Sequence, residues 1–462
     1  MGKIKVGYLP LYIKLYDDSD PAKRNPMVSY METMHAMLES QGLELVKAPV
    51  CRIKEEFENA IDLFHRENVC AVITQHLAYS PSLESIDALA RAGVPLIILD
   101  TTPDYSLIDA AGYERRVSVN HGIHGVQDMC NLLRRRGIPY HLCVGHAMHS
   151  EVIAKAAGMC RAAAAANAYK TARVGSVGGS FTGMGDFMVT DEQYKSAIGA
   201  DVFYMSPADV RENLARVSEE EIENEIALDK VNFTMEVTDT AAYREAVRSG
   251  LAVRKWAEGL NLSAMTINFL TLDICTLPKM PFAECGKAMA RGLGYAGEGD
   301  ALTAGLVGAL RSVYHNTTFT EIFCPDWKED VLLMSHMGEA NPDLAKWKPV
   351  MRTTPFNYNI CGDTAAPYMC YRPGKAVLIN VAPAKEGFSL IATDVEMLDC
   401  GLEYGAYRNS VQGWMKPCMP IADFLARYSE LGGTHHSALV YDADINEILA
   451  FGSMMGFEVH KI

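Results

Sequence analysis

The stretch GLGYAGEGDALTAGLVGAL, residues 292–310, places one acidic side chain at a sharp bend of the chain. Gly297 and Gly299 bracket Glu298, and the absence of a glycine side chain lets the backbone turn there and leaves the carboxylate unobstructed. The turn leads directly into the apolar run Ala301–Leu310. A functional carboxylate is one interpretation. The other is an acid at a helix start, which the helix dipole favours.

The next stretch, FTEIFCPDWKEDVLLMSHMGEANP at residues 319–342, sets Glu321 and His336 beside apolar residues. A buried charge must be paired, neutralised or bound to a metal, because an isolated one is too costly. Together with Glu298, these side chains supply the oxygen and nitrogen donors of a divalent-ion site. They form no local metal motif, however, so their spacing alone leaves open whether they meet.

Upstream of these stretches, short apolar runs alternate with amphipathic segments of helical spacing, which predicts βαβ units on parallel sheets. The pattern predicts an N-terminal α/β domain over residues 1–172 and a central one over 173–318. Arg116–Asn120 is expected to be a strand. Gln75 and His76 are expected just after a strand, where either a sugar contact or a loop hydrogen bond would suit them.

From residue 319 the segments are β-rich and are separated by Pro and Gly, as in antiparallel strands joined by turns. The expected fold is therefore α/β, with two Rossmann-like parallel-sheet domains followed by a β-rich, barrel-like domain over residues 319–462. One helix, Ile421–Leu431, should end at Gly432, because glycine permits a left-handed helix cap. The acidic run Glu219–Glu225 is expected to be a solvated helix face.

Composition excludes several partners. The formal charge of −15 over 462 residues disfavours nucleic acid and anionic membranes, whose contacts need clustered Lys and Arg. No apolar stretch approaches a membrane span, and the N-terminus is expected to form a first strand rather than a signal peptide. The 12 cysteines show no CxxC pairing, which is typical of buried thiols in a reducing cytoplasm.

Four motifs in the same order resemble those of the L-arabinose isomerase family. They are an AGEGD turn at 296–300, a glutamate after a short run at 319–321, a SHM-x-E segment at 335–339 and a GG-x-HH segment at 432–436. The resemblance implies that Glu298, Glu321, His336 and His436 bind one divalent ion, typically Mn²⁺, with Co²⁺ or Mg²⁺ as alternatives. It also implies a homo-oligomer, a hexamer, with active sites at subunit interfaces.

Weaker matches extend the resemblance to the sugar-binding positions. They place Tyr79, Met184, Phe269 and His435 at the substrate, and His124 on a segment that reaches a neighbouring subunit's active site. Leu9 stands where the family has a glutamine that touches the sugar. This departure concerns the identity of the sugar and leaves the reaction type unchanged. Since side chains alternate in extended backbone, only one of His435 and His436 is expected to face the metal.

The predicted function is a metal-dependent aldose–ketose isomerase that acts through an enediol, with Glu298 and Glu321 as the proton-transferring pair. L-Arabinose, D-galactose and L-fucose are the candidate unphosphorylated aldoses. One alternative is a non-catalytic sugar-binding protein on the same fold. Another is an unrelated α/β hydrolase, which the absence of a Gly-x-Ser-x-Gly elbow disfavours.

Overall fold

The computed structural model describes residues 3–108, 113–399 and 411–462. The chain divides into two compact units, Met1–Ala164 and Ala165–Ile462. The boundary falls inside the helix α7 (Val152–Lys170). The further division of the second unit near residue 318 remains a prediction.

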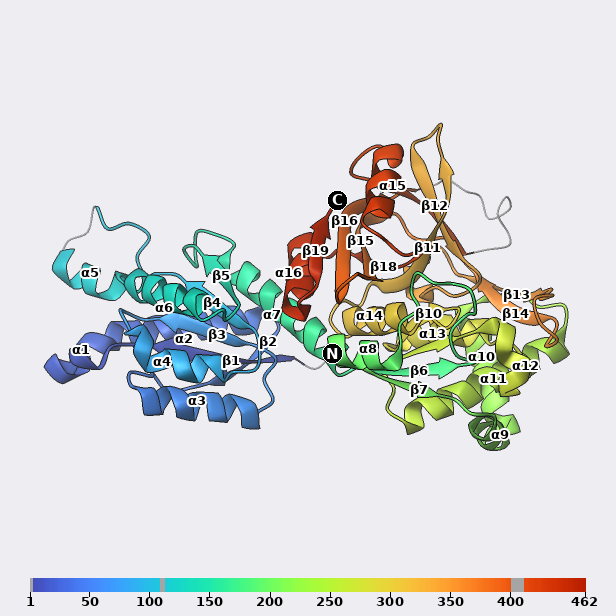
Figure 1. Ribbon diagram of the computed structural model, residues 1–462, viewed down its shortest axis with the longest axis horizontal. Coiled ribbons are helices and arrows are strands. Elements are labelled where there is room, and N and C mark those ends of the chain that lie inside the picture. The colour runs from blue at the N-terminus through green and yellow to red at the C-terminus, as the bar shows by residue number, and fades with distance from the viewer. Residues whose placement is uncertain (1–2, 109–112, 400–410) are drawn as a thin grey trace. The chain divides into compact units, whose positions relative to one another are not determined.

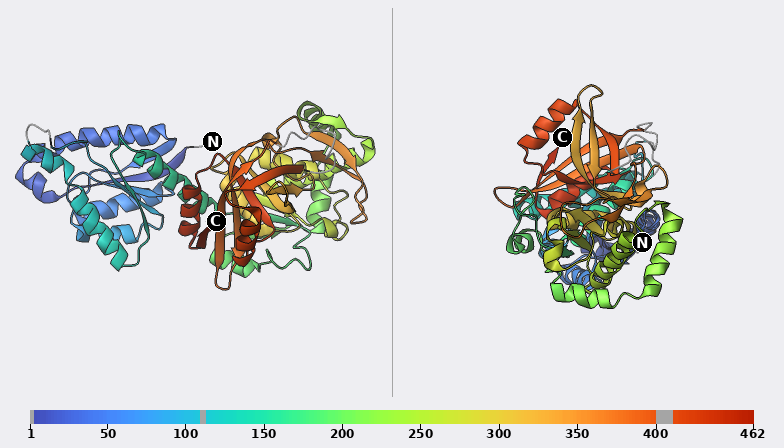
Figure 2. Two further views of the ribbon diagram at one scale, coloured as in Figure 1. Left: turned by 90° about the horizontal axis from the view of Figure 1, so that it is seen from above. Right: turned by 90° about the vertical axis from the view of Figure 1, so that its right-hand side faces the viewer.

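The first unit is built on a five-stranded sheet with the order β2-β1-β3-β4-β5, in which all neighbours are parallel. Helices lie on both sides of this sheet (Figures 1 and 2). The strands are β1 (Ile4–Leu11), β2 (Leu43–Lys47), β3 (Val72–His76), β4 (Leu96–Asp100) and β5 (Tyr140–Val144). The helices before α7 are α1 (Lys14–Ser19), η1 (Pro21–Arg24), α2 (Asn25–Ser40), α3 (Lys54–Arg66), α4 (Ser82–Ala90), α5 (Tyr113–Asn120) and α6 (Ile123–Arg135).

Two expectations for this unit are wrong in detail. Residues 116–120 belong to the helix α5 and form no strand. The β-branched residues of so short a segment mislead, because β-propensity depends on tertiary context. Gln75 and His76 are the last residues of β3 and are buried, so they belong to the interior of the unit rather than to a loop.

The second unit begins with a four-stranded parallel sheet of order β10-β9-β6-β7. Its strands are β6 (Arg173–Val177), β7 (Asp201–Tyr204), β9 (Ala264–Ile267) and β10 (Gly294–Gly297). Its helices are α8 (Asp191–Ala197), α9 (Pro207–Ala215), α10 (Glu219–Asn232), α11 (Thr240–Gly259), η2 (Phe269–Thr271), α12 (Leu272–Cys275), α13 (Phe282–Arg291) and α14 (Ala301–Arg311). The carboxyl ends of the parallel strands lie at one edge, where sites gather in such sheets.

An antiparallel barrel completes the second unit. The sheet runs β15-β18-β11-β12-β17-β16-β19, and β15 also pairs with β16, which closes it. The strands are β11 (Thr317–Asp326), β12 (Val331–His336), β15 (Gly374–Pro383), β16 (Phe388–Met397), β17 (Val411–Pro417), β18 (His436–Tyr441) and β19 (Glu458–Lys461). The apolar helix α14 lies between the parallel sheet and the barrel and contacts both (Figure 1). The expected fold class is therefore confirmed.

The remaining elements are η3 (Pro342–Leu344), α15 (Ile421–Glu430), α16 (Ile445–Met455) and a small sheet of β8 (Thr234–Glu236), β13 (Val350–Thr354) and β14 (Thr364–Tyr368). Gly432 follows α15 with φ +78°, the left-handed cap expected there. The acidic start of α10 is only partly solvated. Glu225 is buried and bonds to Arg254 and Lys287, partners that a charge run cannot reveal. In the described part of the chain, no helix is long and apolar enough to cross a membrane.

Candidate functional site

Glu298 stands just beyond the carboxyl end of β10 in a left-handed backbone conformation, with φ +62°. A non-glycine residue there stores about 1–3 kcal/mol of strain, which the surroundings must hold in place. The Phe181 amide donates to the Glu298 carbonyl oxygen at 3.1 Å, and Thr266 Oγ1 donates to the Gly297 carbonyl oxygen at 3.3 Å. A Cβ at Gly299 would lie 2.2 Å from the Gly179 carbonyl oxygen, so the turn requires glycine at that position.

The barrel supplies the other three residues of the predicted ligand set. Glu321 on β11 lies directly opposite His436 on β18 and opposite Ser335 on β12, the residue before His336. The register of β11 against β12 shifts between Ile322 and Cys324, just past Glu321. A bulge of this kind bends a strand and re-aims its side chains, and bulges are common beside active sites.

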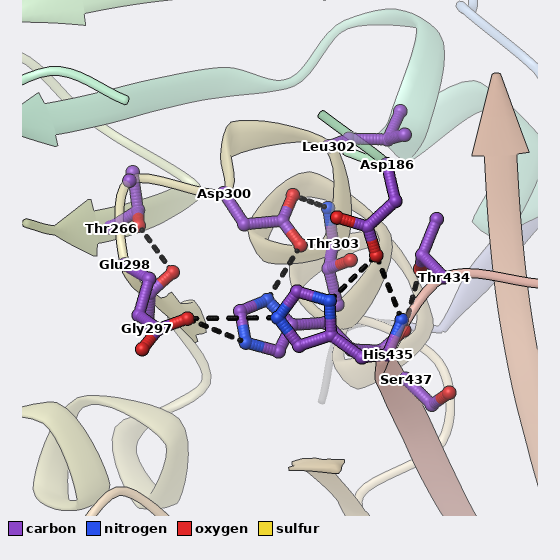
Figure 3. Close-up of polar contacts among 12 residues, drawn as sticks. Asp186, Thr266, Gly297, Glu298, Asp300, Leu302, Thr303, Thr434, His435 and Ser437 are labelled. Atoms are coloured by element: carbon purple, nitrogen blue, oxygen red, sulfur yellow. Dashed lines mark hydrogen bonds and ion pairs between the residues drawn. The ribbon is translucent and has the colours of Figure 1, made fainter. Parts of the chain in front are cut away.

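The predicted ligands come together in two groups that share His436. Donor atoms of Glu321, His336 and His436 lie within 4.8 Å of one another, and so do those of Glu298, His435 and His436. Figure 3 shows the Glu298 carboxylate facing the imidazole of His435. Glu298 Oε2 also lies 3.5 Å from His436 Nε2. Side chains more than 130 positions apart therefore converge where the parallel sheet meets the barrel.

Buried carboxylates hold the Nδ1 side of two imidazoles. Asp300 Oδ2 lies 3.0 Å from His436 Nδ1, while the other oxygen of Asp300 caps α14 by accepting from the Thr303 amide at 2.8 Å. Glu339 Oε2 lies 2.5 Å from His336 Nδ1, and Tyr295 donates to the second Glu339 oxygen. Carboxylates in these positions fix the orientation of each ring and leave its Nε2 free to bind a metal. Metal-binding histidines commonly have such a carboxylate partner on the other ring nitrogen.

His435 also faces Glu298, with 3.6 Å between His435 Nε2 and Glu298 Oε2. The premise that these neighbouring side chains point to opposite sides is wrong, because both imidazoles turn toward Glu298. Which of them faces the metal stays a prediction. Strand alternation does not apply, because β18 begins at His436 and His435 precedes it. Asp186 Oδ2 accepts from His435 Nδ1 at 2.6 Å and from the His435 amide at 3.0 Å.

The two glutamates experience opposite electrostatic environments. Burial would raise the pKa of Glu298, but the facing imidazoles of His435 and His436 outweigh it and hold that pKa well below its usual range. For Glu321 burial dominates, and its pKa is raised despite the nearby imidazoles. Burial would lower the pKa of His436, yet its hydrogen bond to Asp300 and the nearby Glu298 carboxylate raise that pKa to about 9. The site thus concentrates negative charge around the imidazoles.

These residues fit a divalent cation. Nε2 of His436 is buried and has no hydrogen-bond partner among the described residues, while Glu298 Oε2 lies 3.5 Å away. A cation with two carboxylate and two imidazole ligands would fit between these atoms. It would take the place of the proton that His436 binds because its pKa is raised. The chemistry of the donor set suits Mn²⁺, Co²⁺ or Mg²⁺ but does not choose among them.

The predicted sugar-binding residues fall into two sets. Met184 lies in the loop after β6, and Phe269 begins η2 after β9, so both share the sheet edge that carries Glu298. Tyr79 and His124 belong to the first unit. Tyr79 donates to Asp128 at 3.2 Å, and His124 is exposed near the start of α6. Leu9 is fully buried in an apolar core and presents no side-chain surface, so nothing supports its predicted contact with a sugar.

Sequence reasoning missed three acidic residues of the site. Asp300 and Glu339 lie inside the quoted motifs, and their spacing of two residues from Glu298 and three from His336 was a usable signal. Asp186 lies in a glycine-rich loop 249 positions from His435, and no local pattern joins them. Phe187, whose ring stacks on His436 with centroids 5.1 Å apart, was equally hidden.

Comparisons with known proteins point to one family. Residues 183–316 match the family model of the L-arabinose isomerase central domain, and residues 316–458 match that of the L-arabinose isomerase C-terminal domain, together more than half of the chain. Similar curated proteins include L-arabinose isomerases of Oceanobacillus iheyensis (25% identity, 85% of each chain), Aeromonas salmonicida (24%, 94% of this chain and 89% of that one) and Shouchella clausii (23%, 98% and 92%).

Proposed function

The chain belongs to the L-arabinose isomerase family and is an aldose–ketose isomerase, and we propose that it acts on an unphosphorylated aldose with a divalent ion bound by Glu298, Glu321, His336 and His436. The observation that carries this proposal is the pair of donor groups that share His436. L-Arabinose is the first candidate substrate, since the relatives are named for it. D-Galactose and L-fucose are the alternatives.

A neutral sugar suits the charges of the site. The ionic partners of Glu298 are imidazoles, and the carboxylates Asp186 and Asp300 stand behind them. A phosphorylated sugar would instead call for lysine, arginine or backbone amides around its dianion. Aromatic rings at the same sheet edge, Phe181 and Phe269 with centroids 5.7 Å apart, offer apolar surface for a sugar face.

Isomerisation moves one proton between neighbouring carbons and another between their oxygens. A bound divalent ion would supply Lewis-acid polarisation of the carbonyl and stabilise the developing negative charge. Glu298 and Glu321 approach the shared imidazole from the parallel sheet and from the barrel, respectively, so two carboxylates flank one space. One takes the carbon-bound proton and the other serves the oxygens, as general acid–base catalysis requires.

The direct test incubates the metal-loaded protein with L-arabinose, D-galactose and L-fucose and measures ketose formation. One sugar should be converted, EDTA should abolish the conversion, and Mn²⁺ should restore it. Glu298→Gln and Glu321→Gln should each keep the fold, seen by circular dichroism, and lose at least about a hundredfold in kcat. Near-normal turnover in either variant, or full activity after EDTA treatment, would contradict the proposal.

Two further parts of the proposal concern context. We propose a homo-oligomer, a hexamer, in which the exposed His124 reaches the site of a neighbouring subunit. A monomer on a sizing column that retains full activity would refute it.

We also propose a cytoplasmic location. Support comes from the free thiols among the described cysteines, several of them buried, which suit a reducing compartment.

A further inference from the structure

The loop Gly178–Phe187, which follows β6, touches the site at three points. The amide of Phe181 donates to the carbonyl oxygen of Glu298 at 3.1 Å. The carboxylate of Asp186 accepts twice from His435, and the ring of Phe187 stacks on that of His436 at an interplanar angle of 8°. A segment without regular secondary structure therefore contacts both histidines and the backbone of the strained glutamate.

Asp186 determines which nitrogen of His435 carries the proton. An ionised carboxylate only accepts hydrogen bonds, so the short contact of 2.6 Å places a proton on His435 Nδ1. The lone pair of the neutral ring then lies on Nε2, which is the nitrogen that faces Glu298 Oε2 at 3.6 Å. The second bond, from the His435 amide at 3.0 Å, holds the backbone that carries the ring.

We infer that Asp186 is a positioning residue of the isomerase, which holds His435 with Nε2 toward Glu298 and so tunes the affinity of the site for its cation. This inference rests on the divalent site proposed above. His435 needs such a partner more than His436 does, because it precedes β18 and no strand pairing restrains it. Although His435 is not one of the four proposed ligands, its donor atom lies within 4.8 Å of those of Glu298 and His436. Residues that hold an imidazole at a metal site typically change metal affinity or activity by about 10–100-fold when removed.

The Asp186–His435 contact can be mutated with less damage to the core than the Asp300–His436 and Glu339–His336 contacts. Asp300 and Glu339 are almost fully buried, so their replacement disturbs the core. The Asp186 side chain retains 36% of its exposure, and its partner comes from a loop. Moreover, both hydrogen bonds from His435 end on the same oxygen, Oδ2. An asparagine can present its amide oxygen there and keep both bonds, whereas alanine loses both.

The experiment titrates metal-stripped protein with Mn²⁺ by calorimetry and then measures kcat and KM. Asp186→Ala should weaken Mn²⁺ binding by about 10–100-fold, and Asp186→Asn should stay much closer to the native protein. The matched control is Asp191→Ala, which removes a nearby exposed carboxylate bonded to the Tyr204 hydroxyl at 2.7 Å rather than to an imidazole. This control should bind Mn²⁺ normally.

A role limited to anchoring the loop predicts a different result. Asp186→Ala would lower Tm in either case, so Tm does not distinguish the two roles. If the Mn²⁺ affinity of Asp186→Ala matches that of the control, the inference is overturned. In a His435→Ala background, Asp186→Ala should have no further effect on Mn²⁺ affinity; an undiminished effect also overturns it. If Asp186→Ala does not fold, Asp186→Ser replaces it, because serine is too short to reach the ring. Failure of the native protein to bind Mn²⁺ would instead refute the proposed function.

Discussion

Replacing Asp300 should separate two tasks that one carboxylate performs through two different oxygens. Oδ1 caps α14 at the Thr303 amide, and Oδ2 bonds to His436 Nδ1. Asp300→Ala removes a helix cap, which costs about 1 kcal/mol within a range of 0.5–2. It also leaves a fully buried imidazole nitrogen without a partner, which costs about 1–3 kcal/mol. The expected destabilisation is therefore about 2–4 kcal/mol.

Thermal unfolding of the metal-free protein measures this loss. In a unit of this size each kcal/mol shifts Tm by roughly 2 °C, so Asp300→Ala should lower Tm by about 4–8 °C. Asp239→Ala is the matched control, because Asp239 caps α11 through the Ala241 and Ala242 amides and contacts no imidazole. It should lose only the cap, about 2 °C.

Mn²⁺ binding provides the second measurement. Asp300→Ala should weaken it by about 10–100-fold, since the His436 ring loses the group that orients it, while Asp239→Ala should leave it unchanged. Asp300→Asn should fall between the two, because its single oxygen can serve either the cap or the imidazole. The reasoning is refuted if Asp300→Ala and Asp239→Ala show equal Tm losses and equal Mn²⁺ affinities.

Three further predictions concern the surroundings of the site and the two cores. Gly299→Ala should abolish turnover or folding, because φ +79° and a Cβ placed 2.2 Å from the Gly179 carbonyl oxygen leave no room; near-native activity would contradict this. Arg254→Met should cost about 1.5–3 kcal/mol in urea unfolding, since it removes charged hydrogen bonds to Glu225 and Glu284, while Lys287 and Arg291 still pair with these carboxylates. Burial lowers the pKa of His76 to about 3, so between about pH 6.5 and 3 the unfolded chain binds a proton that the folded chain does not. The protein should therefore become less stable as the pH is lowered through this range, and the Tm of His76→Asn should depend less on pH.

Much of the architecture was readable from local patterns. Apolar runs that alternate with amphipathic segments predicted both parallel sheets, and Gly432 predicted the left-handed end of α15. The glycines around Glu298 predicted a turn, which the structure places after β10. These features follow from backbone conformation and hydrophobic periodicity, and such properties act over a few residues. The four ligand candidates could be identified from the family motifs, because each motif is a short local pattern that can be recognised without knowledge of the fold.

The tertiary structure decided which groups stand around those candidates. Asp186 and His435 are far apart in the chain, and only the packing of a loop against the start of β18 joins them. Strand pairing sets Glu321 opposite His436, and the closing of the barrel over α14 brings that pair to Glu298. Burial and electrostatic partners are properties of the folded chain, so the sequence determined the elements and the ligand types, whereas their distances, tautomers and pKa values arose only from the fold.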